Sequence, residues 1–362
     1  MTTVFFAGGG TGGHLYPGLA IARALSRLRP DVRSFFVGAQ RGIEREVLPR
    51  ESYPYTLLDL HPLYRPRVWN NWKTVRGAFG AWRRLGQLVA TEKPALVVGT
   101  GGYASGLGLA YAVAHGIPIV EQIADSYPGL TARFFARYAR EGYLGYPEAK
   151  QYLPRGTYVD TGCPIDPPPV PRPDRAAARA AWSLPDDGVV LLIFGGSQGA
   201  RALNAVVDAW IARGLPDGLS VIWGTGRANY DAHAHREAPR VRVRPYLSPI
   251  ADAYAASDGA VARAGAMTTS ELCAWGLPMI LVPLPTAAAD HQSANARALA
   301  AAGAAVHLPQ ATLTPETLDR AVGDVMLTPA TRAAMASAAS QRARPDAADH
   351  IARRLLMLLD SA

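Results

Sequence analysis

Short apolar runs alternate with stretches of helical hydrophobic spacing along the whole chain. In the first half this pattern predicts strands at 3–7, 32–37, 55–60, 95–98, 118–121 and 157–160, and helices at 15–28, 74–90 and 106–114. In the second half it predicts strands at 189–194, 219–223, 241–243, 259–262, 279–282 and 305–308. Regular alternation of strands and helices is typical of parallel sheets with helices on both faces. The predicted fold class is therefore α/β, with doubly wound, Rossmann-like parallel sheets.

A proline-rich break at 163–173 divides this pattern into two parts. It predicts a first domain over 1–163, a linker over 164–187 and a second domain over 188–345. A last helix, predicted at 346–360, lies beyond the final strand and can pack on either domain. The length of 362 residues also favours two domains, because one hydrophobic core rarely supports so long a chain.

Glycine-rich turns directly follow three of the predicted strands, at 8–13, 99–106 and 195–199. Such a turn exposes backbone N–H groups at a helix N-terminus, which favours an anion such as a phosphate. Turns after parallel strands emerge at one edge of the sheet, so the turns at 8–13 and 99–106 are expected to line one site. With one such edge in each half, the two domains are expected to face a central cleft. Tight packing of strand on helix is the alternative explanation.

The residues around these turns disfavour a dinucleotide site and exclude a P-loop. The first turn formally matches GxGxxG, but the second predicted strand lacks the acidic residue at its end that a nicotinamide site needs, and Asp31 precedes that strand. No GKS or GKT follows either the first or the second-half turn, which excludes a P-loop.

The composition predicts a basic surface. The net charge of +8 comes almost wholly from Arg. It is compatible with phosphorylated substrates or an anionic membrane face. No basic segment has the length or aromatic interleaving of a nucleic-acid module, so nucleic acid is not an expected partner. Cys163 and Cys273 lack metal-ligand spacing and are interpreted as reduced packing residues.

His14 ends the first glycine turn and is the candidate general base. A helix N-terminus lowers the pKa of an imidazole and leaves it neutral, so it can take a proton from a hydroxyl nucleophile. Capping of the helix is the alternative role for His14.

The segment 263–271 follows a predicted strand and opens a helix in the second half. Its free N–H groups, its Thr hydroxyls and Arg263 suit a phosphate, and Glu271 can accept from two adjacent hydroxyls, as on a ribose. A capping-box glutamate is the alternative for Glu271. One strand later, Asp290, Gln292 and Asn295 fall near one helix face and are candidates for holding sugar hydroxyls, with solvated capping as the alternative.

Basic and aromatic residues interleave over 65–84. Trp72, Val75, Phe79 and Trp82 fall at helical spacing, which fits a helix lying in the headgroups of an anionic membrane. A helix whose apolar stripe faces the core of the first domain is the alternative.

Five stretches together resemble one enzyme family over nearly the whole chain. They are GGTGGHLYPGLAIA at 9–22, GTGGYASG at 99–106, GGSQGARALN at 195–204, RAGAMTTSELCAWGLP at 263–278 and DHQSANARAL at 290–299. This chain resembles the MurG family, inverting GT-B glycosyltransferases of family 28. The family transfers N-acetylglucosamine from UDP-N-acetylglucosamine (UDP-GlcNAc) to the muramyl sugar of lipid I, which forms lipid II for peptidoglycan.

The resemblance implies a role for each matching residue of the first half. Thr11, Gly12 and Gly13 would approach the sugar and diphosphate, and His14 would be the base for the acceptor hydroxyl. Asp125 stands where the family has an Asn that contacts the sugar nucleotide. A second departure, Asp166, replaces a family Arg and is not assigned a role.

The resemblance also implies that the second half binds the donor. Ser197 and Gln198 would contact the nucleotide, and the backbone near Leu247 would contact the uracil edge. Glu271 would bind the ribose and Gln292 the N-acetylglucosamine. The diphosphate would be cradled by five consecutive residues, Ala266, Met267, Thr268, Thr269 and Ser270.

The implied partners are UDP-GlcNAc, the undecaprenyl-diphosphate-linked muramyl pentapeptide (lipid I) and an anionic membrane surface. No cofactor and no metal are expected, and the expected place is the cytoplasmic face of the bacterial cell membrane, as a peripheral protein. Three alternatives stay open. They are another GT-B UDP-sugar transferase with a different acceptor, an epimerase or hydrolase of UDP-GlcNAc, and a binding subunit without turnover.

Overall fold

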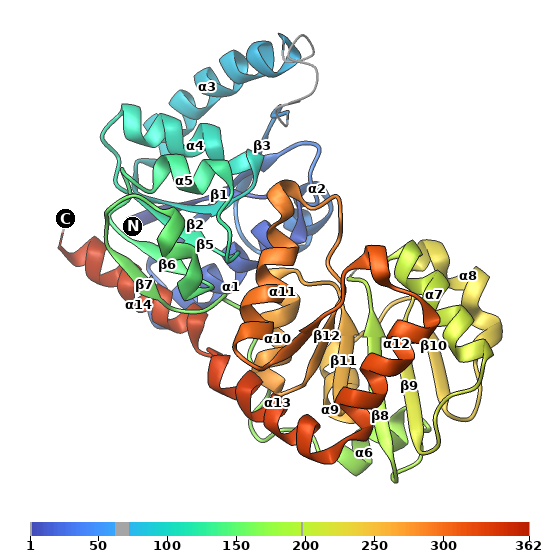
Figure 1. Cartoon of the computed structure of the whole chain (residues 1–362). Helices are drawn as coiled ribbons and strands as arrows, with labels where there is room; N and C mark the ends of the chain where they lie inside the picture. The colour runs from blue at the N-terminus through green and yellow to red at the C-terminus, as the bar shows by residue number, and fades with distance from the viewer. Residues whose placement is uncertain (1, 62–71, 197, 362) are drawn as a thin grey trace. The chain divides into compact units, whose positions relative to one another are not determined.

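The computed structural model describes residues 2–61, 72–196 and 198–361, with the backbone alone for 72–76. It divides into two compact units (Figure 1). Unit 1 comprises Met1–Asp166 and Arg344–Ala362, and unit 2 comprises Pro167–Ala343. Each unit is described separately below.

Unit 1 is built on a seven-stranded sheet in the order β3-β2-β1-β4-β5-β6-β7, and every adjacent pair is parallel. Strands β1 to β3 extend the sheet in one direction and β4 to β7 extend it in the other, so the order reverses between β1 and β4. The turns after β1 and β4 therefore meet at the carboxyl edge, where ligands bind in such sheets. The strands are β1 (Thr2–Gly8), β2 (Val32–Ala39), β3 (Tyr55–Leu58), β4 (Pro94–Gly101), β5 (Ile119–Ile123), β6 (Gly142–Leu144) and β7 (Tyr158–Asp160).

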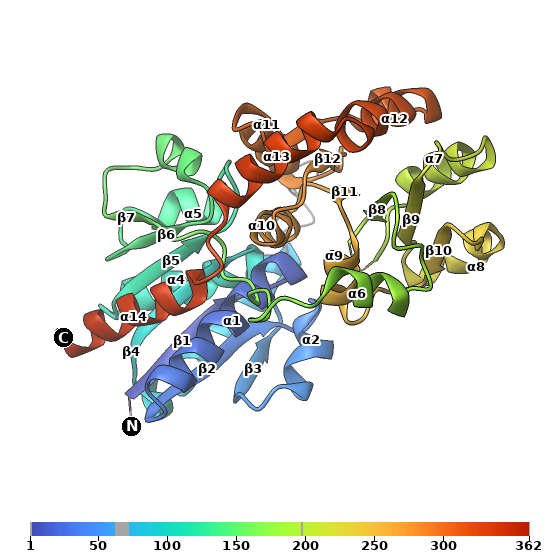
Figure 2. The same cartoon turned by 90° about the horizontal axis from the view of Figure 1, so that it is seen from below.

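Helices cover both faces of this sheet because its strands are apolar on both sides. Val4 and Phe6 of β1 face a core shared with Leu19 of α1 and Ile351 of α14, whereas Phe5 faces a core shared with α3 and α4. Figure 2 shows α14 alongside α1 over the sheet. The helices are α1 (Gly12–Leu28), α2 (Glu44–Val47), α3 (Trp72–Glu92), α4 (Tyr103–Ala114), α5 (Leu130–Phe135) and α14 (Ala347–Asp360), with 3₁₀ turns η1 (Leu48–Arg50) and η3 (Pro147–Tyr152).

Unit 2 repeats the architecture with a six-stranded parallel sheet in the order β10-β9-β8-β11-β12-β13. The turns after β8 and β11 lie at its own switch point. The strands are β8 (Val189–Phe194), β9 (Leu219–Gly224), β10 (Val241–Arg244), β11 (Gly259–Ala262), β12 (Met279–Leu281) and β13 (Ala305–His307). The α-helices are α6 (Arg175–Ala181), α7 (Arg201–Ala212), α8 (Tyr230–His233), α9 (Ile250–Ala256), α10 (Ala266–Trp275), α11 (His291–Ala301), α12 (Pro315–Val322) and α13 (Pro329–Arg342).

The predicted fold class is confirmed, because both halves form Rossmann-like parallel sheets. Both cysteines are buried, as expected of packing residues. No helix in the described ranges combines the length and apolar content that a membrane crossing requires.

Part of the stretch predicted as a linker is folded instead. Helix α6 lies within it and is capped by the Asp174 carboxylate, which accepts from Ala177 N at 2.8 Å. Arg179 of the same helix is buried and donates to Asp258 Oδ2 at 2.7 Å and to the Ala256 carbonyl at 3.3 Å. The buried Arg179–Asp258 pair joins α6, within the predicted linker, to the rest of unit 2.

Candidate functional site

The turn between β1 and α1 requires glycine at two positions. Gly9 and Gly10 have φ of 135° and 90°, a region that L-residues with side chains rarely adopt. A Cβ at Gly9 would lie 2.0 Å from Glu44 Oε1, and one at Gly10 would lie 2.6 Å from the Tyr103 ring. The turn therefore has no room for side chains, and its backbone lies against Glu44 and Tyr103.

Glu44 is a structural partner of this turn that the sequence analysis did not identify. It is fully buried, and its Oε1 accepts from Gly10 N at 2.9 Å and from Ala39 N at 3.0 Å. The carboxylate thus joins the end of β2 to the glycine turn. One signal was present in the sequence: Glu44 shares a helical face with Val47 and Leu48, which places an acid on the apolar side of α2.

Replacement of Glu44 by Ala is expected to lower the free energy of unfolding by about 2 kcal/mol or more, because two buried backbone donors lose their acceptor. Glu44→Gln keeps an oxygen at the Oε1 position and is the matched control. Urea denaturation of both variants checks the prediction. A Gln variant as unstable as the Ala variant would contradict the role of the Oε1 hydrogen bonds.

His14 is the third residue of α1 and lies half-buried next to the β4–α4 turn. Its Nδ1 and the Thr11 hydroxyl lie 3.0 Å apart, which fixes the imidazole ring by a hydrogen bond. A Cβ at Gly101 would lie 2.7 Å from His14 Cδ2, and one at Gly102 would lie 3.1 Å from Nδ1. The turns at 8–13 and 99–106 therefore lie side by side, as expected. Thr11 is the N-cap, so His14 does not cap the helix.

The other first-half candidates lie at or near the same edge. Gly12 and Gly13 are the first two residues of α1. Asp125 is half-buried and stands two residues beyond β5, the strand next to β4. Asp166, which replaces a family Arg, is paired with Arg23 Nη1 at 3.5 Å.

In unit 2, α10 begins directly after β11, with Gly265 as its N-cap. Its first N–H groups have no intrahelical acceptor, which leaves them able to donate to an anion. Met267, Thr268 and Ser270 are half-buried there, and Ala266 is buried.

Two residues of this segment do not face a phosphate as expected. Thr269 is fully buried, and its hydroxyl donates to the Gly265 carbonyl at 3.0 Å. The buried Arg263 donates to the carbonyls of Val282 and Pro283, each at 3.0 Å, and to Gln310 Oε1 at 2.7 Å. Burial also lowers the pKa of Arg263. Its guanidinium stabilises the segment after β12, so the prediction that it adds charge to the anion site is wrong.

Glu271 is the sixth residue of α10, too far along the helix for a capping box. Its Oε2 accepts from the Tyr254 hydroxyl at 2.6 Å. Tyr254 lies on α9 and is buried, and burial with the neighbouring Glu271 raises its pKa well above the ordinary value. Tyr254 stays a neutral donor and orients the carboxylate, a partner that the sequence analysis missed because 17 residues separate the two.

Helix α11 holds the side chain of Gln292 against a neighbouring turn and buries that of Asn295. Gln292 Oε1 accepts from Leu284 N at 2.9 Å, so its side chain lies against the turn that follows β12. Asn295 is fully buried and donates to the Ala264 carbonyl at 3.1 Å. The prediction that Asn295 holds a sugar hydroxyl is wrong. Asp290 has a φ of 54° and forms an ion pair of 3.9 Å with Arg297.

The turn after β8 also depends on glycine, since a Cβ at Gly199 would lie 2.1 Å from the Thr225 carbonyl oxygen. Gln198 is exposed in this turn, and Ser197 lies outside the described residues. Leu247 is buried, and a Cβ at Gly224 would lie 2.9 Å from its Cδ1. Its side chain packs inward, which leaves the backbone as the part that can contact a ligand.

The residues of α3 that were predicted to contact a membrane differ in exposure. Phe79 is 79% exposed. Trp82 is half-buried and packs on Tyr111 of α4 with ring centroids 4.8 Å apart, against the core on that face of the sheet. Trp82 therefore follows the alternative, core-facing interpretation. The segment 65–71 and the side chains of Trp72 and Val75 lie outside the described residues.

No three His, Cys, Asp or Glu side chains come together as metal ligands in the part of the chain that the structure describes.

Comparisons with known proteins agree with the arrangement of both units. Residues 4–143 match the glycosyltransferase family 28 N-terminal domain, and residues 190–351 match the family 28 C-terminal domain. A UDP-N-acetylglucosamine–N-acetylmuramyl-(pentapeptide) pyrophosphoryl-undecaprenol N-acetylglucosamine transferase of Salinibacter ruber is 41% identical over 364 residues, which cover 99% of this chain and 97% of that protein. The transferase of the same name from Moorella thermoacetica is 37% identical, with 99% of each chain covered. The crystal structure of Acinetobacter baumannii MurG matches with a TM-score of 0.77 at 29% identity, over 99% of this chain and 100% of that one.

Proposed function

Because the chain belongs to glycosyltransferase family 28, we propose that it transfers N-acetylglucosamine from UDP-GlcNAc to the muramyl sugar of lipid I, which forms lipid II for peptidoglycan. The observation that carries this proposal is similarity along the whole length to transferases of that name. It is also supported by the strand order, which gives each sheet a switch point where such an enzyme would bind a ligand.

Unit 2 would bind the donor. The first N–H groups of α10 and the positive end of its dipole would hold the diphosphate, with Thr268 and Ser270 beside it. Glu271, oriented by Tyr254, would accept from the ribose hydroxyls. Gln292 would contact the sugar. Gln198, Ser197 and the backbone at Leu247 would contact the nucleotide.

Unit 1 would bind the acceptor and supply the base. Thr11 holds the His14 ring at 3.0 Å, beside the N–H groups of Gly12 and Gly13. In the proposed step, His14 takes the proton of the acceptor hydroxyl, whose oxygen bonds to the anomeric carbon. The bond from that carbon to UDP breaks on the opposite face, and its electron pair leaves on the diphosphate. Stabilisation of that developing charge by the α10 N-terminus lowers the barrier.

Association with the cytoplasmic face of an anionic membrane is part of the same proposal. It is supported by the net charge of +8, by the exposed Phe79 on α3 and by the neighbouring exposed Arg83 and Arg84. Cationic residues beside an exposed aromatic ring are typical of surfaces that lie among anionic headgroups.

Incubation with UDP-GlcNAc, with and without a lipid I analogue, tests the proposal. UDP release only when the acceptor is present, together with a disaccharide product, is the expected result. UDP release without acceptor would indicate a hydrolase or epimerase, and no release in either case would indicate a binding protein. Equal transfer to an unrelated acceptor would favour another GT-B transferase.

Replacement of Glu271 by Ala is expected to raise the donor KM about tenfold with little change in kcat, because a charged hydrogen-bond acceptor for the ribose is lost. Calorimetry with UDP and with 2′-deoxy-UDP checks the assignment. Wild type should prefer UDP, and the variant should bind the two alike. Tyr254→Phe should have a smaller effect in the same direction. Unaltered discrimination in Glu271→Ala would remove Glu271 from the ribose site.

A further inference from the structure

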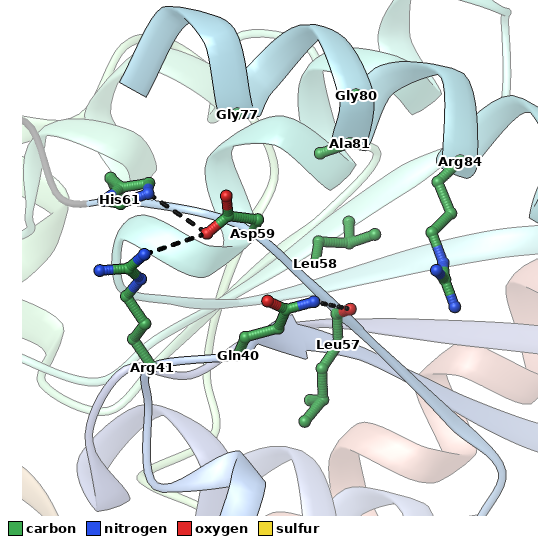
Figure 3. Close-up of a pocket in the computed structure, with 10 residues that line it drawn as sticks. All are labelled: Gln40, Arg41, Leu57, Leu58, Asp59, His61, Gly77, Gly80, Ala81 and Arg84. Carbon is green, nitrogen blue, oxygen red and sulfur yellow. Dashed lines mark hydrogen bonds and ion pairs between the residues drawn. The ribbon is translucent and has the colours of Figure 1, made fainter. Parts of the chain in front are cut away.

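A pocket of about 540 Å³ opens in unit 1 under α3 (Figure 3). Gln40 and Arg41, which follow β2, and Asp59 and His61, which follow β3, line one side of it. The pocket therefore lies at the carboxyl edge of the sheet, the edge that also carries His14. Of the residues that line this pocket, only Arg84 is named above, as one of the two exposed arginines near Phe79.

The pocket carries charges of both signs. Asp59 Oδ1 lies 3.5 Å from Arg41 Nη2 and 3.2 Å from His61 Nε2. Arg84 of α3 lies across the pocket from Arg41, with Leu58 between them (Figure 3). A site for phosphate alone would not be expected to hold a carboxylate. Two guanidinium groups with a carboxylate and an apolar strip between them fit a peptide that bears its own carboxylates and N–H donors.

The floor of the pocket is the end of an edge strand. Among the described strands, β3 pairs with β2 alone, at the margin of the sheet. The Leu57 carbonyl at the pocket accepts from Gln40 Nε2 at 3.4 Å, the long limit of a hydrogen bond. A backbone N–H of an extended peptide can replace this weak donor, and addition to an edge strand is a common mode of peptide recognition.

Two glycines of α3 form the roof. A Cβ at Gly77 would lie 2.6 Å from the Asp59 carbonyl oxygen, so α3 approaches β3 as closely as backbone allows. A Cβ at Gly80, by contrast, would meet no atom within 4 Å. Gly80 therefore keeps the pocket open, and a larger side chain there would fill the pocket without displacing the helix.

We propose that this pocket binds the peptide branch of the acceptor, an extended peptide that carries carboxylates. The inference rests on the proposed function, because the acceptor named for the relatives bears a pentapeptide. The peptide carboxylates would pair with Arg41 and Arg84, and its N–H or ammonium donors would face Asp59. Its apolar side chains would lie along Leu57 and Leu58.

Calorimetric titration of the full chain with N-acetylmuramyl pentapeptide, which lacks the lipid and the diphosphate, tests this directly. Arg84→Ala is expected to weaken binding about tenfold, the effect of one lost charged hydrogen bond. Arg83→Ala is the matched control: both arginines are exposed on α3, but Arg83 does not line the pocket. It should change the affinity less than about twofold.

Transfer assays with Gly80→Leu provide the second test. The acceptor KM should rise about tenfold for lipid I, and it should not change for a lipid-linked muramyl diphosphate without peptide. The kcat and the donor KM should stay as in wild type. Gly80→Ala adds only one methyl group and serves as the folding control.

Three results would overturn the inference. The first is an equal loss of affinity in Arg83→Ala and Arg84→Ala, which would indicate a general effect of surface charge. The second is no binding of the pentapeptide by wild type, and the third is a Gly80→Leu variant whose acceptor KM rises equally with and without the peptide. Binding of the pentapeptide without any sugar transfer would contradict the proposed function and support the pocket. Sugar transfer without pentapeptide binding would support the proposed function and contradict the pocket as a peptide site.

Discussion

Replacement of His14 by Ala is expected to lower kcat by about 10²- to 10⁴-fold, the usual contribution of a general base. The Thr11 hydroxyl at 3.0 Å fixes the imidazole, and the glycines of the β4–α4 turn leave no side chain between that turn and the ring. The Ala variant should bind UDP with nearly unchanged affinity, because the contacts proposed for the uracil, the ribose and the α10 diphosphate site lie in unit 2 and none of them involves His14. Single-turnover transfer assays and UDP calorimetry measure the two quantities separately.

His14→Gln is the matched control for this prediction. A Gln side chain can keep a hydrogen bond to Thr11 but cannot take a proton near neutral pH, so its kcat should fall as far as that of the Ala variant. Thr11→Val should lower kcat about tenfold, because the His14 ring is then less well oriented. A His14→Ala variant within threefold of wild type would remove His14 from the chemistry.

The stability of unit 1 is expected to fall as pH rises, because of a buried carboxyl on β5. Glu121 is 3% exposed, and burial raises its pKa to about 9 from an ordinary 4.5. The folded state therefore keeps this proton where the unfolded chain has lost it. Its stabilising contribution is complete below pH 4.5 and is lost as pH rises toward 9. Between pH 5 and pH 8 the loss amounts to about 4 kcal/mol.

Glu121→Gln removes the titration and keeps the shape of the side chain. The variant should be more stable than wild type at pH 8, and the difference should become small near pH 4.5. Urea denaturation across this range measures it. Glu46→Gln makes the same change at an exposed position of α2 and is the control. A stability difference independent of pH would show that Glu121 does not titrate as a buried acid.

The elements that the sequence predicted best are those with a strong local signal. All the predicted strands are present in the structure. Parallel strands covered on both faces are apolar runs, so they can be recognised from the sequence without knowing which strand they pair with. The short strand β6 (Gly142–Leu144) was missed, since three residues give no periodicity. The glycine turns and the residues at the start of α1 and α10 were likewise predicted from the residues that follow each strand in the sequence.

Contacts between distant segments could not be predicted in this way. Glu44 accepts from the backbone of Gly10, 34 residues away, and Tyr254 donates to Glu271 of α10, 17 residues away. Arg263 and Asn295 carry polar groups next to a candidate site, and only the structure shows that they point into the protein. The interleaved basic and aromatic residues favoured a membrane surface for Trp82, although its half-buried ring packs on Tyr111 against the core.

The return of α14 to unit 1 affects the order in which the protein can fold during synthesis. Unit 2 is a continuous segment, whereas unit 1 needs residues from both ends of the chain. Ile351 and Leu355 complete the α1 side of the first sheet only after the ribosome has made the last helix. Unit 1, whose synthesis begins first, is therefore expected to complete its fold after unit 2, and until then the apolar residues of α1 that α14 covers stay exposed.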